Sequence, residues 1–384
     1  MKKISIEERP DWQRIVENEG FDFHTIDGER YWDERGYYQF SERQISDDLE
    51  APTQDVHAMC LDAVERVVES EELLTRLAIP PAFFDLVRDS WREGHPHLYG
   101  RFDFIYDGNG PARCIEANYD TPTSLLEAGS VQLLWLEHQV TAGVLPARAT
   151  QFNTIAEDLV QAFGAFPNDA PFHFSAMSGS REDRGTTDFL RRMAAHTGID
   201  ARHIDIEDIG LRDGQFVDLD GQWIQRLFKL HAWEHIFHEP FGQAVPGCDT
   251  QFVEPAWKSI VSNKGILALL WEFNEGHPNL LPTFVDREPQ RPVPAGWVRK
   301  PYFSREGANI ELRTPEGQFL AEDGPYTDAP YILQEFVPLP RFGDSYTLVG
   351  SWVIGDVASG IGIREDDSLI TKDTSRFLPH VVID

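Results

Sequence analysis

The spacing of hydrophobic positions divides the chain into a helical first quarter, a mixed middle and a strand-rich end. Over residues 55–77, apolar residues recur every three or four positions, and the run stops before Pro80 and Pro81. This period is that of an amphipathic helix, and proline ends such a helix. We therefore expect residues 1–95 to form a mostly helical N-terminal region.

Between residues 98 and 118 the pattern changes to alternation. Two alternating runs flank the turn-forming residues 107–110, which predicts a β-hairpin. An apolar stripe at helical spacing follows, with Thr121 in the expected capping position and Pro122 at the first helical position. Residues 96–170 are predicted to form a core of hairpin and helix.

The pattern over residues 171–255 is strand, helix, strand. The segments "FHFSAM", "TTDFLRRMAAHTG" and "ARHIDI" predict a small βαβ-like subdomain, with a further hairpin at "GQFVDLDGQWI". Residues 256–273 have a helical pattern, and the chain after the proline-rich stretch 288–296 is rich in strands. The pattern as a whole predicts an α+β fold with an inserted βαβ subdomain.

Polar side chains gather on one face of the predicted hairpin. A hairpin loop with an even number of residues places Arg101 and Asp103 on the same sheet face as Glu116 and Asn118. With a four-residue loop, Asp103 lies opposite Cys114 and Arg101 lies opposite Glu116, so that Asp103 and Glu116 are diagonal neighbours. Two carboxylates, an amide oxygen and a guanidinium would then share one surface.

These residue types suit a cation and a phosphate. Asp103, Glu116 and the carbonyl of Asn118 are hard oxygen ligands of the kind that Mg²⁺ shares with substrate phosphates. Arg101 would supply a positive charge for phosphoryl oxygens. A helix starting at Thr121 would add free backbone N–H groups, a ready anion site. The alternative is an ordinary hairpin with one polar face.

The C-terminal third holds a second group of candidates. "WVRKPYFSREGANIEL" predicts a strand, a glycine-containing loop and a strand, with Lys300 on the first strand and Gly307 in a loop able to lie over phosphates. "ILQEF" could form a nucleotide-edge strand, and "GIGIRED" places Arg364 on another strand. Taken singly, each has a plain structural explanation, and no Walker A or GxGxxG pattern occurs.

Taken in order, these segments resemble the glutathionylspermidine synthetase family, carboxylate–amine ligases with an ATP-grasp fold. The resemblance covers nearly the whole chain and runs through "RFDFIYDGNGPARCIEANYDTPTSLLEAG", "LFKLHAWEHIF", "SNKGILALLW", "RKPYFSREGANI" and "GIGIREDDSLI". It implies an ATP-grasp-like fold in which residues 256–384 form the nucleotide-binding part. The hairpin at 98–118 would complete the active site.

The resemblance also assigns roles to individual residues. It implies paired Mg²⁺ ions on Asp103, Glu116 and Asn118, with Arg101 and Arg364 stabilising the charge of the transferred phosphoryl group. The resemblance further implies that Lys264 and Lys300 contact the ATP phosphates and that the loop with Gly307 lies over them. It places adenine at Gln334 and Glu335. Thr121 and Thr123 would contact the acid substrate. Lys258, six residues before Lys264, is an alternative phosphate ligand. Asp120 is expected at the helix entry rather than among the metal ligands.

The implied reaction is ATP-dependent formation of an amide bond. A substrate carboxylate takes the γ-phosphoryl group to become an acyl phosphate, and an amine then displaces phosphate. In the family the acid is peptide-like and the amine a polyamine. The bifunctional members also carry an amidase domain, whereas this chain begins directly with the synthetase-like part.

Two other functions compete with this one. "HAWEH" matches the H-x-x-E-H pattern of a zinc metallopeptidase, with His231 and His235 as ligands and Glu234 as base, if the stretch is helical. The chain could also be a nucleotide-binding protein without catalysis. No GxSxG motif or evident cysteine pair supports covalent catalysis.

Composition narrows the class of partner and the compartment. The formal net charge of −30 argues against nucleic acid as a partner, although it would tolerate a cationic small molecule. The three widely spaced cysteines form no disulfide or metal motif, which fits a reducing compartment. The N-terminal segment has no apolar core of a signal peptide, and no apolar run is long enough to cross a bilayer. We expect a cytoplasmic enzyme.

Overall fold

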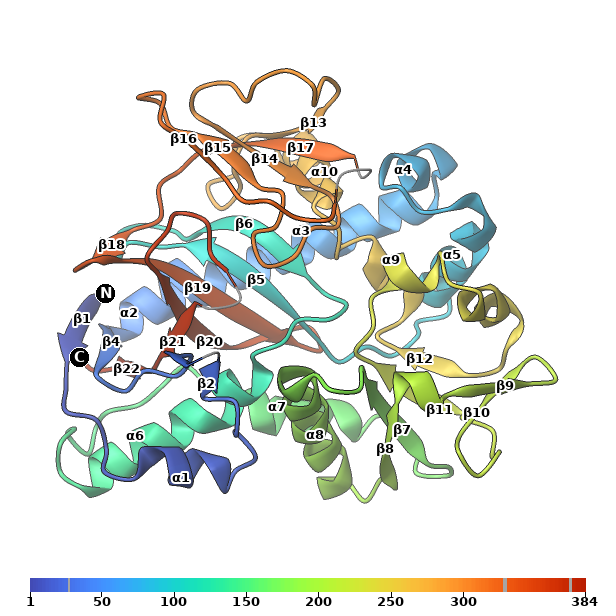
Figure 1. The fold of residues 1–384 in the computed structure, drawn as a ribbon, viewed down its shortest axis with the longest axis horizontal. Helices are drawn as coiled ribbons and strands as arrows, with labels where there is room; N and C mark the ends of the chain where they lie inside the picture. Colours follow the sequence, from blue (N-terminus) through green and yellow to red (C-terminus); the bar gives the residue numbers. More distant parts are fainter. Residues whose placement is uncertain (27, 327–329, 373–374) are drawn as a thin grey trace.

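The two ends of the chain meet in one small sheet. A computed structural model describes residues 1–26, 28–326, 330–372 and 375–384 (Figure 1). In it, β4 (Gly36–Phe40) pairs with β1 (Lys2–Ser5) on one side and with β22 (His380–Val382) on the other. The helical pattern of the first quarter did not indicate these strands, because each depends on a partner far away in the sequence.

The rest of the first quarter is mostly helical and also contains a short hairpin. Its elements are α1 (Trp12–Glu17), the hairpin β2 (Thr25–Ile26) and β3 (Glu29–Arg30), α2 (Glu42–Ile45), η1 (Ser46–Glu50), α3 (Ala51–Val68), α4 (Glu71–Arg76), η2 (Pro81–Phe83) and α5 (Phe84–Arg92). The single helix expected over 55–77 is two helices. The break falls at Ser70, whose Oγ accepts a hydrogen bond from the backbone N–H of Leu73 and so caps α4.

A six-stranded antiparallel sheet forms the centre of the molecule. Its strands are β5 (Tyr99–Ile105), β6 (Arg113–Asn118), β18 (Arg341–Phe342), β19 (Ser345–Ile354), β20 (Val357–Asp366) and β21 (Arg376–Leu378), in the order β21-β20-β19-β5-β6 with β18 beside β19. The predicted hairpin and the two long C-terminal strands are confirmed. Segments about 250 residues apart thereby become neighbours, because β5 pairs directly with β19.

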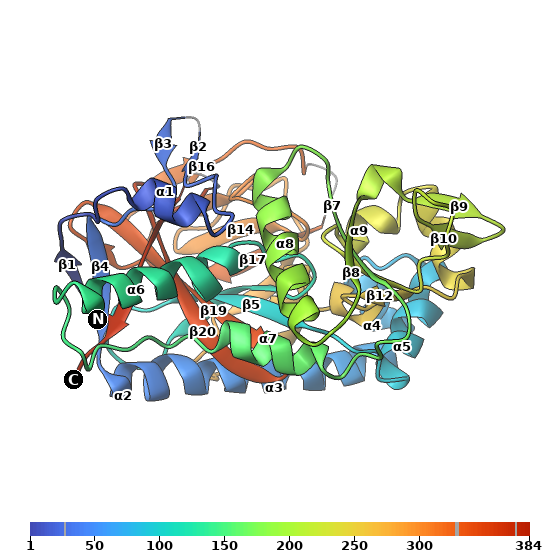
Figure 2. The same cartoon turned by 90° about the horizontal axis from the view of Figure 1, so that it is seen from below.

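Helices cover both faces of this sheet. Figure 2 shows α3 on one side, where the Thr53 hydroxyl lies 2.7 Å from that of Ser351, and α6 (Gln132–Thr141) on the other. On the second side, η3 (Glu127–Val131) and α7 (Ile155–Phe163) lie close against β20 because two of its residues facing them are glycines. A Cβ on Gly360 would come within 3.0 Å of Ile155 Cδ1.

The helix expected to begin at Thr121 begins later. Residues 121–124 are irregular, Ser124 has a φ of 74°, and helical structure starts at Leu125. Thr121 therefore does not cap a helix and Pro122 is not its first residue. The predicted anion site on helical N–H groups at Thr121 is wrong. The left-handed backbone at Ser124 turns the chain before the helix can start.

The segment predicted as strand, helix, strand has these elements in this order, and its strands belong to a parallel sheet. β7 (Phe172–Ala176), α8 (Arg181–His196) and β8 (Ala201–Asp205) are followed by the hairpin β9 (Gly210–Arg212) and β10 (Gln215–Val217), then β11 (Arg226–Lys229), α9 (Trp233–Ile236), η5 (Phe241–Gly247) and β12 (Gln251–Val253). The sheet order is β12-β11-β7-β8. The hairpin expected at 214–224 forms as well, since Val217 pairs antiparallel with Trp223 and the backbone N–H of Ile224 donates to the carbonyl of Phe216.

A five-stranded antiparallel sheet lies against one edge of the molecule (Figure 1). It consists of β13 (Thr283–Asp286), β14 (Trp297–Pro301), β15 (Glu311–Arg313), β16 (Phe319–Ala321) and β17 (Tyr331–Glu335), in the order β13-β17-β14-β15-β16. It follows η6 (Ala256–Ser259) and α10 (Gly265–Phe273), so the helix expected over 256–273 is interrupted. Among the described residues, no helix is long and apolar enough to span a membrane.

Candidate functional site

The hairpin of β5 and β6 brings four predicted site residues to one face, but in a different register. Arg101 pairs with Asn118 and Asp103 pairs directly with Glu116. The loop contains seven residues, an odd number, and a bulge between Asp103 and Phe104 adds one more on the β6 side. The odd loop and the bulge offset each other, so the four side chains still point to the same face of the sheet, as they would with an even loop. The shared face is confirmed, and the expected diagonal placement of Asp103 and Glu116 is wrong.

Asp103 is held between two guanidinium groups. Arg101 Nε donates to Asp103 Oδ1 at 2.9 Å, and Arg364 Nη2 donates to Oδ2 at 2.5 Å. Burial alone would raise the pKa of this carboxyl, but the two arginines outweigh burial and hold the pKa below its ordinary value. Arg101 pairs with Trp352 on β19, and its side chain passes close to Gly350, where a Cβ would come within 3.2 Å of Arg101 Cδ.

Glu116 lies beside the first of the predicted phosphate lysines. Lys264 Nζ is 3.1 Å from Glu116 Oε1, and the Glu116 side chain is 30% exposed. Lys258 lies elsewhere, fully buried in an ion pair with Glu254 and bonded to the backbone carbonyl of Tyr99. Of the two lysines that the sequence left open, Lys264 is therefore the one at the site.

The second predicted phosphate lysine lies on the five-stranded sheet. Lys300 Nζ donates to Gln334 Oε1 at 2.7 Å and to the backbone carbonyl of Ile115 at 3.1 Å, which joins this sheet to β6. Burial lowers the pKa of Lys300 to about 8, although nearby Glu116 works in the opposite direction. Gln334 is buried, whereas Glu335 is exposed.

The irregular segment after β6 is tied to the same group. Asn118 Oδ1 accepts from the N–H of Thr121 at 3.2 Å, and Arg101 Nη1 donates to the carbonyl of Thr123 at 3.0 Å. Arg305 Nη1 donates to Thr121 Oγ1 at 2.8 Å. Sequence reasoning did not single out Arg305, although it stands inside the "RKPYFSREGANI" segment on which the resemblance rests.

Most of these residues line two adjoining cavities. The polar cavity, of about 390 Å³, is bordered by eight of the predicted residues, namely Arg101, Asp103, Glu116, Asn118, Thr121, Thr123, Gly307 and Arg364. The inner cavity, between the five-stranded and central sheets, is bordered by Lys300, Gln334 and Glu335. Asp103 and Glu116 border both cavities. The twelfth residue, Lys264, reaches the site through its contact with Glu116.

Gly307 needs to be glycine for two reasons. Its φ is 75°, a left-handed backbone that residues with a Cβ adopt at a cost. A Cβ there would also come within 2.7 Å of Ile370 Cγ2 and of the carbonyl oxygen of Thr371. The loop from Tyr302 to Ile310 can therefore lie closely over the segment that follows β20, at the edge of the polar cavity.

Acidic side chains line the far side of the polar cavity, and the sequence analysis did not identify them. Glu182 and Asp183, from the first turn of α8, border it together with Tyr31. Tyr31 donates a hydrogen bond of 2.7 Å to the buried carboxyl of Glu127. The cavity thus has arginines toward the central sheet and carboxylates toward α8. No sequence motif marked these acids, since they come from two segments that are separate in the sequence.

Asp120 has a structural role. Its carboxylate is buried, pairs with the buried ammonium of Lys229 and accepts from the backbone N–H of Trp233. It therefore ties the segment after β6 to the end of β11. The expected position of Asp120 at a helix entry is wrong, because helical structure starts only at Leu125.

The zinc arrangement at residues 231–235 does not form. α9 begins at Trp233, so His231 precedes the helix, and Glu234 Oε1 is held by Arg305 at 2.6 Å. His231 Nε2 lies 2.9 Å from Glu239 Oε1. In the part of the chain that the structure describes, no group of three His, Cys, Asp or Glu side chains is placed to hold a metal ion.

Comparisons with known proteins point to one family. The family described as "Glutathionylspermidine synthase preATP-grasp" matches residues 3–383. A Haemophilus influenzae protein named "Putative acid–amine ligase" is 37% identical, with both chains covered over 100% of their length. The Crithidia fasciculata trypanothione synthetase is 28% identical over 84% of this chain, and the Escherichia coli bifunctional glutathionylspermidine synthetase/amidase is 26% identical over 90% of it. The chain spans 53% and 59% of these two longer relatives.

A solved structure shares the fold. The glutathione synthetase-like effector of Globodera pallida superposes with a TM-score of 0.56, covering 98% of each chain at 11% sequence identity. This likeness concerns the fold alone and agrees with a mixed helix and strand architecture of the glutathione synthetase type. Since the family match extends over almost every residue, the chain belongs to the glutathionylspermidine synthase family.

Proposed function

We propose that the protein is an ATP-dependent acid–amine ligase that forms an amide bond through an acyl phosphate and releases ADP. The observation that carries the proposal is the junction of the two cavities at Asp103 and Glu116. Lys300 borders the inner cavity, Lys264 contacts Glu116, and Arg101 and Arg364 border the polar cavity, which suits a nucleotide and an acid that meet at the junction. The relatives, which are ligases by name, support it.

The inner cavity is assigned to ATP. Its walls include apolar residues of both sheets that suit the adenine ring, and Lys300 stands toward the central sheet. The ammonium groups of Lys300 and Lys264 would neutralise part of the negative charge of the phosphates. Gln334 holds Lys300 in place through its amide oxygen.

The donor set between the cavities fits Mg²⁺. Two carboxylates and one amide oxygen lie on alternate pairs of β5 and β6, which share one face, and the Glu116 side chain is 30% exposed. Such oxygen ligands are those of a hard cation, which when bound would neutralise and orient the phosphates. Asp103, Glu116 and Asn118 would hold it, with Arg101 and Arg364 contributing the remaining positive charge.

The polar cavity is assigned to the acid. Arg101 and Arg364 can stabilise the negative charge that develops as the carboxylate takes the γ-phosphoryl group. Arg305 positions the segment 121–124 through Thr121, so that Thr121 and Thr123 stay at the cavity wall. The amine then attacks the acyl carbon, the bond to phosphate breaks, and the amine proton passes to solvent or a nearby carboxylate.

The direct test is ADP release from mixtures of acids and amines, followed by mass detection of the adduct. An acid–amine pair that raises ADP release and yields the condensed product would establish the ligase. ATP binding without release by any pair would instead establish a nucleotide-binding protein without catalysis.

Metal removal distinguishes the ligase from the peptidase. EDTA should lower substrate-dependent ADP release to background, because the phosphates lose their countercharge, and added Mg²⁺ should restore it. The zinc-selective chelator 1,10-phenanthroline should leave the rate unchanged. Inhibition by phenanthroline that Zn²⁺ alone reverses would contradict the assignment.

Lys300 should make nucleotide binding depend on pH. In the free protein its ammonium is present below about pH 8 and is lost as pH rises through that value. We expect the Kd for ATP to increase between pH 7 and pH 9.5, since a phosphate contact loses its charge. Calorimetry on the wild type and on Lys300→Met checks this. The variant should bind weakly with a flat profile, and an unchanged slope in it would contradict the role of Lys300.

A further inference from the structure

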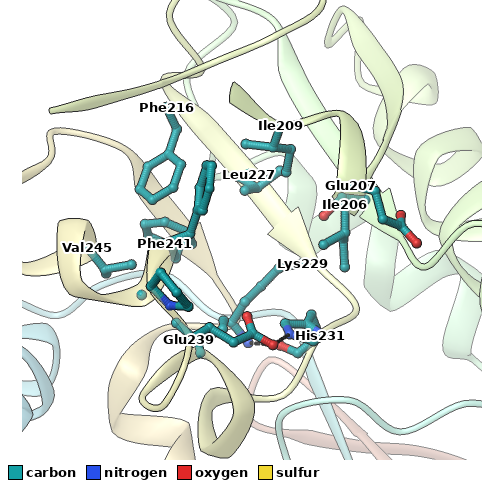
Figure 3. A pocket seen from close by; sticks show the side chains of 15 residues that line it. Ile206, Glu207, Ile209, Phe216, Leu227, Lys229, His231, Glu239, Phe241 and Val245 are labelled. Atoms are coloured by element: carbon teal, nitrogen blue, oxygen red, sulfur yellow. Dashed lines mark hydrogen bonds and ion pairs between the residues drawn. The ribbon is translucent and has the colours of Figure 1, made fainter. Parts of the chain in front are cut away.

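A separate cavity of about 310 Å³ lies in the parallel-sheet region, beside β11 and η5 (Figure 3). Its walls are mostly apolar and come from β7, η4, β10, β11, the stretch from α9 through η5, and β12. They include Ile206, Ile209, Phe216, Leu227, Val245 and Phe252. The volume is at the lower end of small-molecule sites and is sufficient for one ring or a branched chain. Nothing in the proposed mechanism uses this space.

One end of this apolar cavity is polar. Figure 3 shows Lys229, His231 and Glu239 together there, with the ion pair of His231 and Glu239 drawn as a dashed line. The Lys229 charge is balanced by buried Asp120, and the Glu239 side chain is 46% exposed. The other acid of the lining, Glu207, already accepts hydrogen bonds from Ser178. Glu239 therefore gives the entrance an accessible negative charge.

The apolar cavity adjoins the polar one. His231 borders both of them, and its neighbours Leu230 and Ala232 border the polar cavity. A molecule whose apolar part occupies the apolar cavity can therefore extend a polar group past His231 toward the arginines and Glu116.

We propose that this cavity holds the apolar body of the amine substrate, a primary amine with an aromatic or branched aliphatic group. The inference rests on the proposed ligase function. A carboxylate is disfavoured at the entrance because Glu239 would repel it, whereas an ammonium group would be attracted. A polyamine is disfavoured inside because the apolar walls would leave its internal ammonium groups without partners.

The first test measures binding of 2-phenylethylamine to the full chain without nucleotide, by ligand-observed NMR. Ile209→Trp should fill the cavity from its half-buried edge and raise the Kd at least about tenfold. The matched control is Leu211→Trp, two residues further along the chain in β9, which is 42% exposed and outside the lining and should leave the Kd within about twofold. Equal Kd values for the two variants would overturn the proposal.

The second test concerns charge. 3-Phenylpropionate, which carries a carboxylate in place of the amine, should bind at least about tenfold more weakly than 2-phenylethylamine. Glu239→Gln should reduce that preference, and Asp208→Asn, an exposed acid outside the lining, should not. Equal affinity for the two probes, or saturable binding of spermidine without binding of 2-phenylethylamine, would overturn the proposal.

These outcomes separate the cavity from the ligase function. Binding that responds to Ile209→Trp, in a chain that releases no ADP with any acid, would refute the ligase and leave the cavity assignment standing. A ligase that condenses only polyamines at a rate unaffected by Ile209→Trp would refute the cavity assignment alone.

Discussion

Replacement of Glu116 by alanine should lower substrate-dependent ADP formation at least about a hundredfold, or about 2.7 kcal/mol of barrier. Glu116 borders both main cavities, and its carboxylate is the accessible oxygen donor beside Lys264. Without it the phosphates lose a metal ligand, and Lys264 loses the partner that orients it. Steady-state ADP release at saturating ATP, acid and amine measures the effect.

The controls for Glu116 separate chemistry from folding. Glu116→Gln keeps the size of the side chain and removes the charge, so it should lose nearly as much activity. Glu316→Ala removes an exposed carboxylate in a distant turn and should change nothing. Activity of Glu116→Ala within about tenfold of the wild type, or 1.4 kcal/mol, would show that the assignment of the site is wrong.

Replacement of Glu254 by glutamine should produce the largest loss of stability, about 3–5 kcal/mol. Glu254 and Lys258 form an ion pair of 2.8 Å with no exposed surface on either side chain. Glu254 also accepts from the backbone N–H groups of Leu98 and Tyr99, at the start of β5. Burial lowers the pKa of Lys258 even with its partner present, so the neutral replacement leaves a costly buried charge. Denaturant unfolding followed by tryptophan fluorescence measures the change.

A second substitution and a surface pair test this explanation. Lys258→Met added to Glu254→Gln should recover at least half of the lost stability, because the unpaired charge is then removed. Glu272→Gln breaks a surface ion pair with Arg76, whose side chains are 50% and 32% exposed, and should cost less than about 1 kcal/mol. If Glu254→Gln and Glu272→Gln lowered the free energy of unfolding equally, burial of the Glu254–Lys258 pair would not explain the cost of breaking it.

Local sequence determined the elements whose signals are local. Alternation over residues 98–118 predicted the hairpin and placed Arg101 with Asp103, and Glu116 with Asn118, because residues two apart on a strand share a face. That both pairs share the same face depends on the seven-residue loop and the bulge, which offset each other. Alternation could not predict the register, since the loop length and the bulge after Asp103 depend on how β5 packs against β19. The predicted helix start at Thr121 is wrong for a related reason. A Thr-Pro pair caps a helix only if the residues after it are helical, and Ser124 has a left-handed backbone.

The residues alone were enough to predict the family and the type of secondary structure in most segments, because both signals are local. The choice between Lys258 and Lys264 required the fold, since the two lysines differ in what surrounds them: Lys258 is buried against Glu254, whereas Lys264 contacts Glu116. The fold also brought Arg305 to Thr121 and created the apolar cavity beside His231. Cavities and long-range ion pairs form between segments that are far apart in the sequence, so local residue patterns cannot predict them.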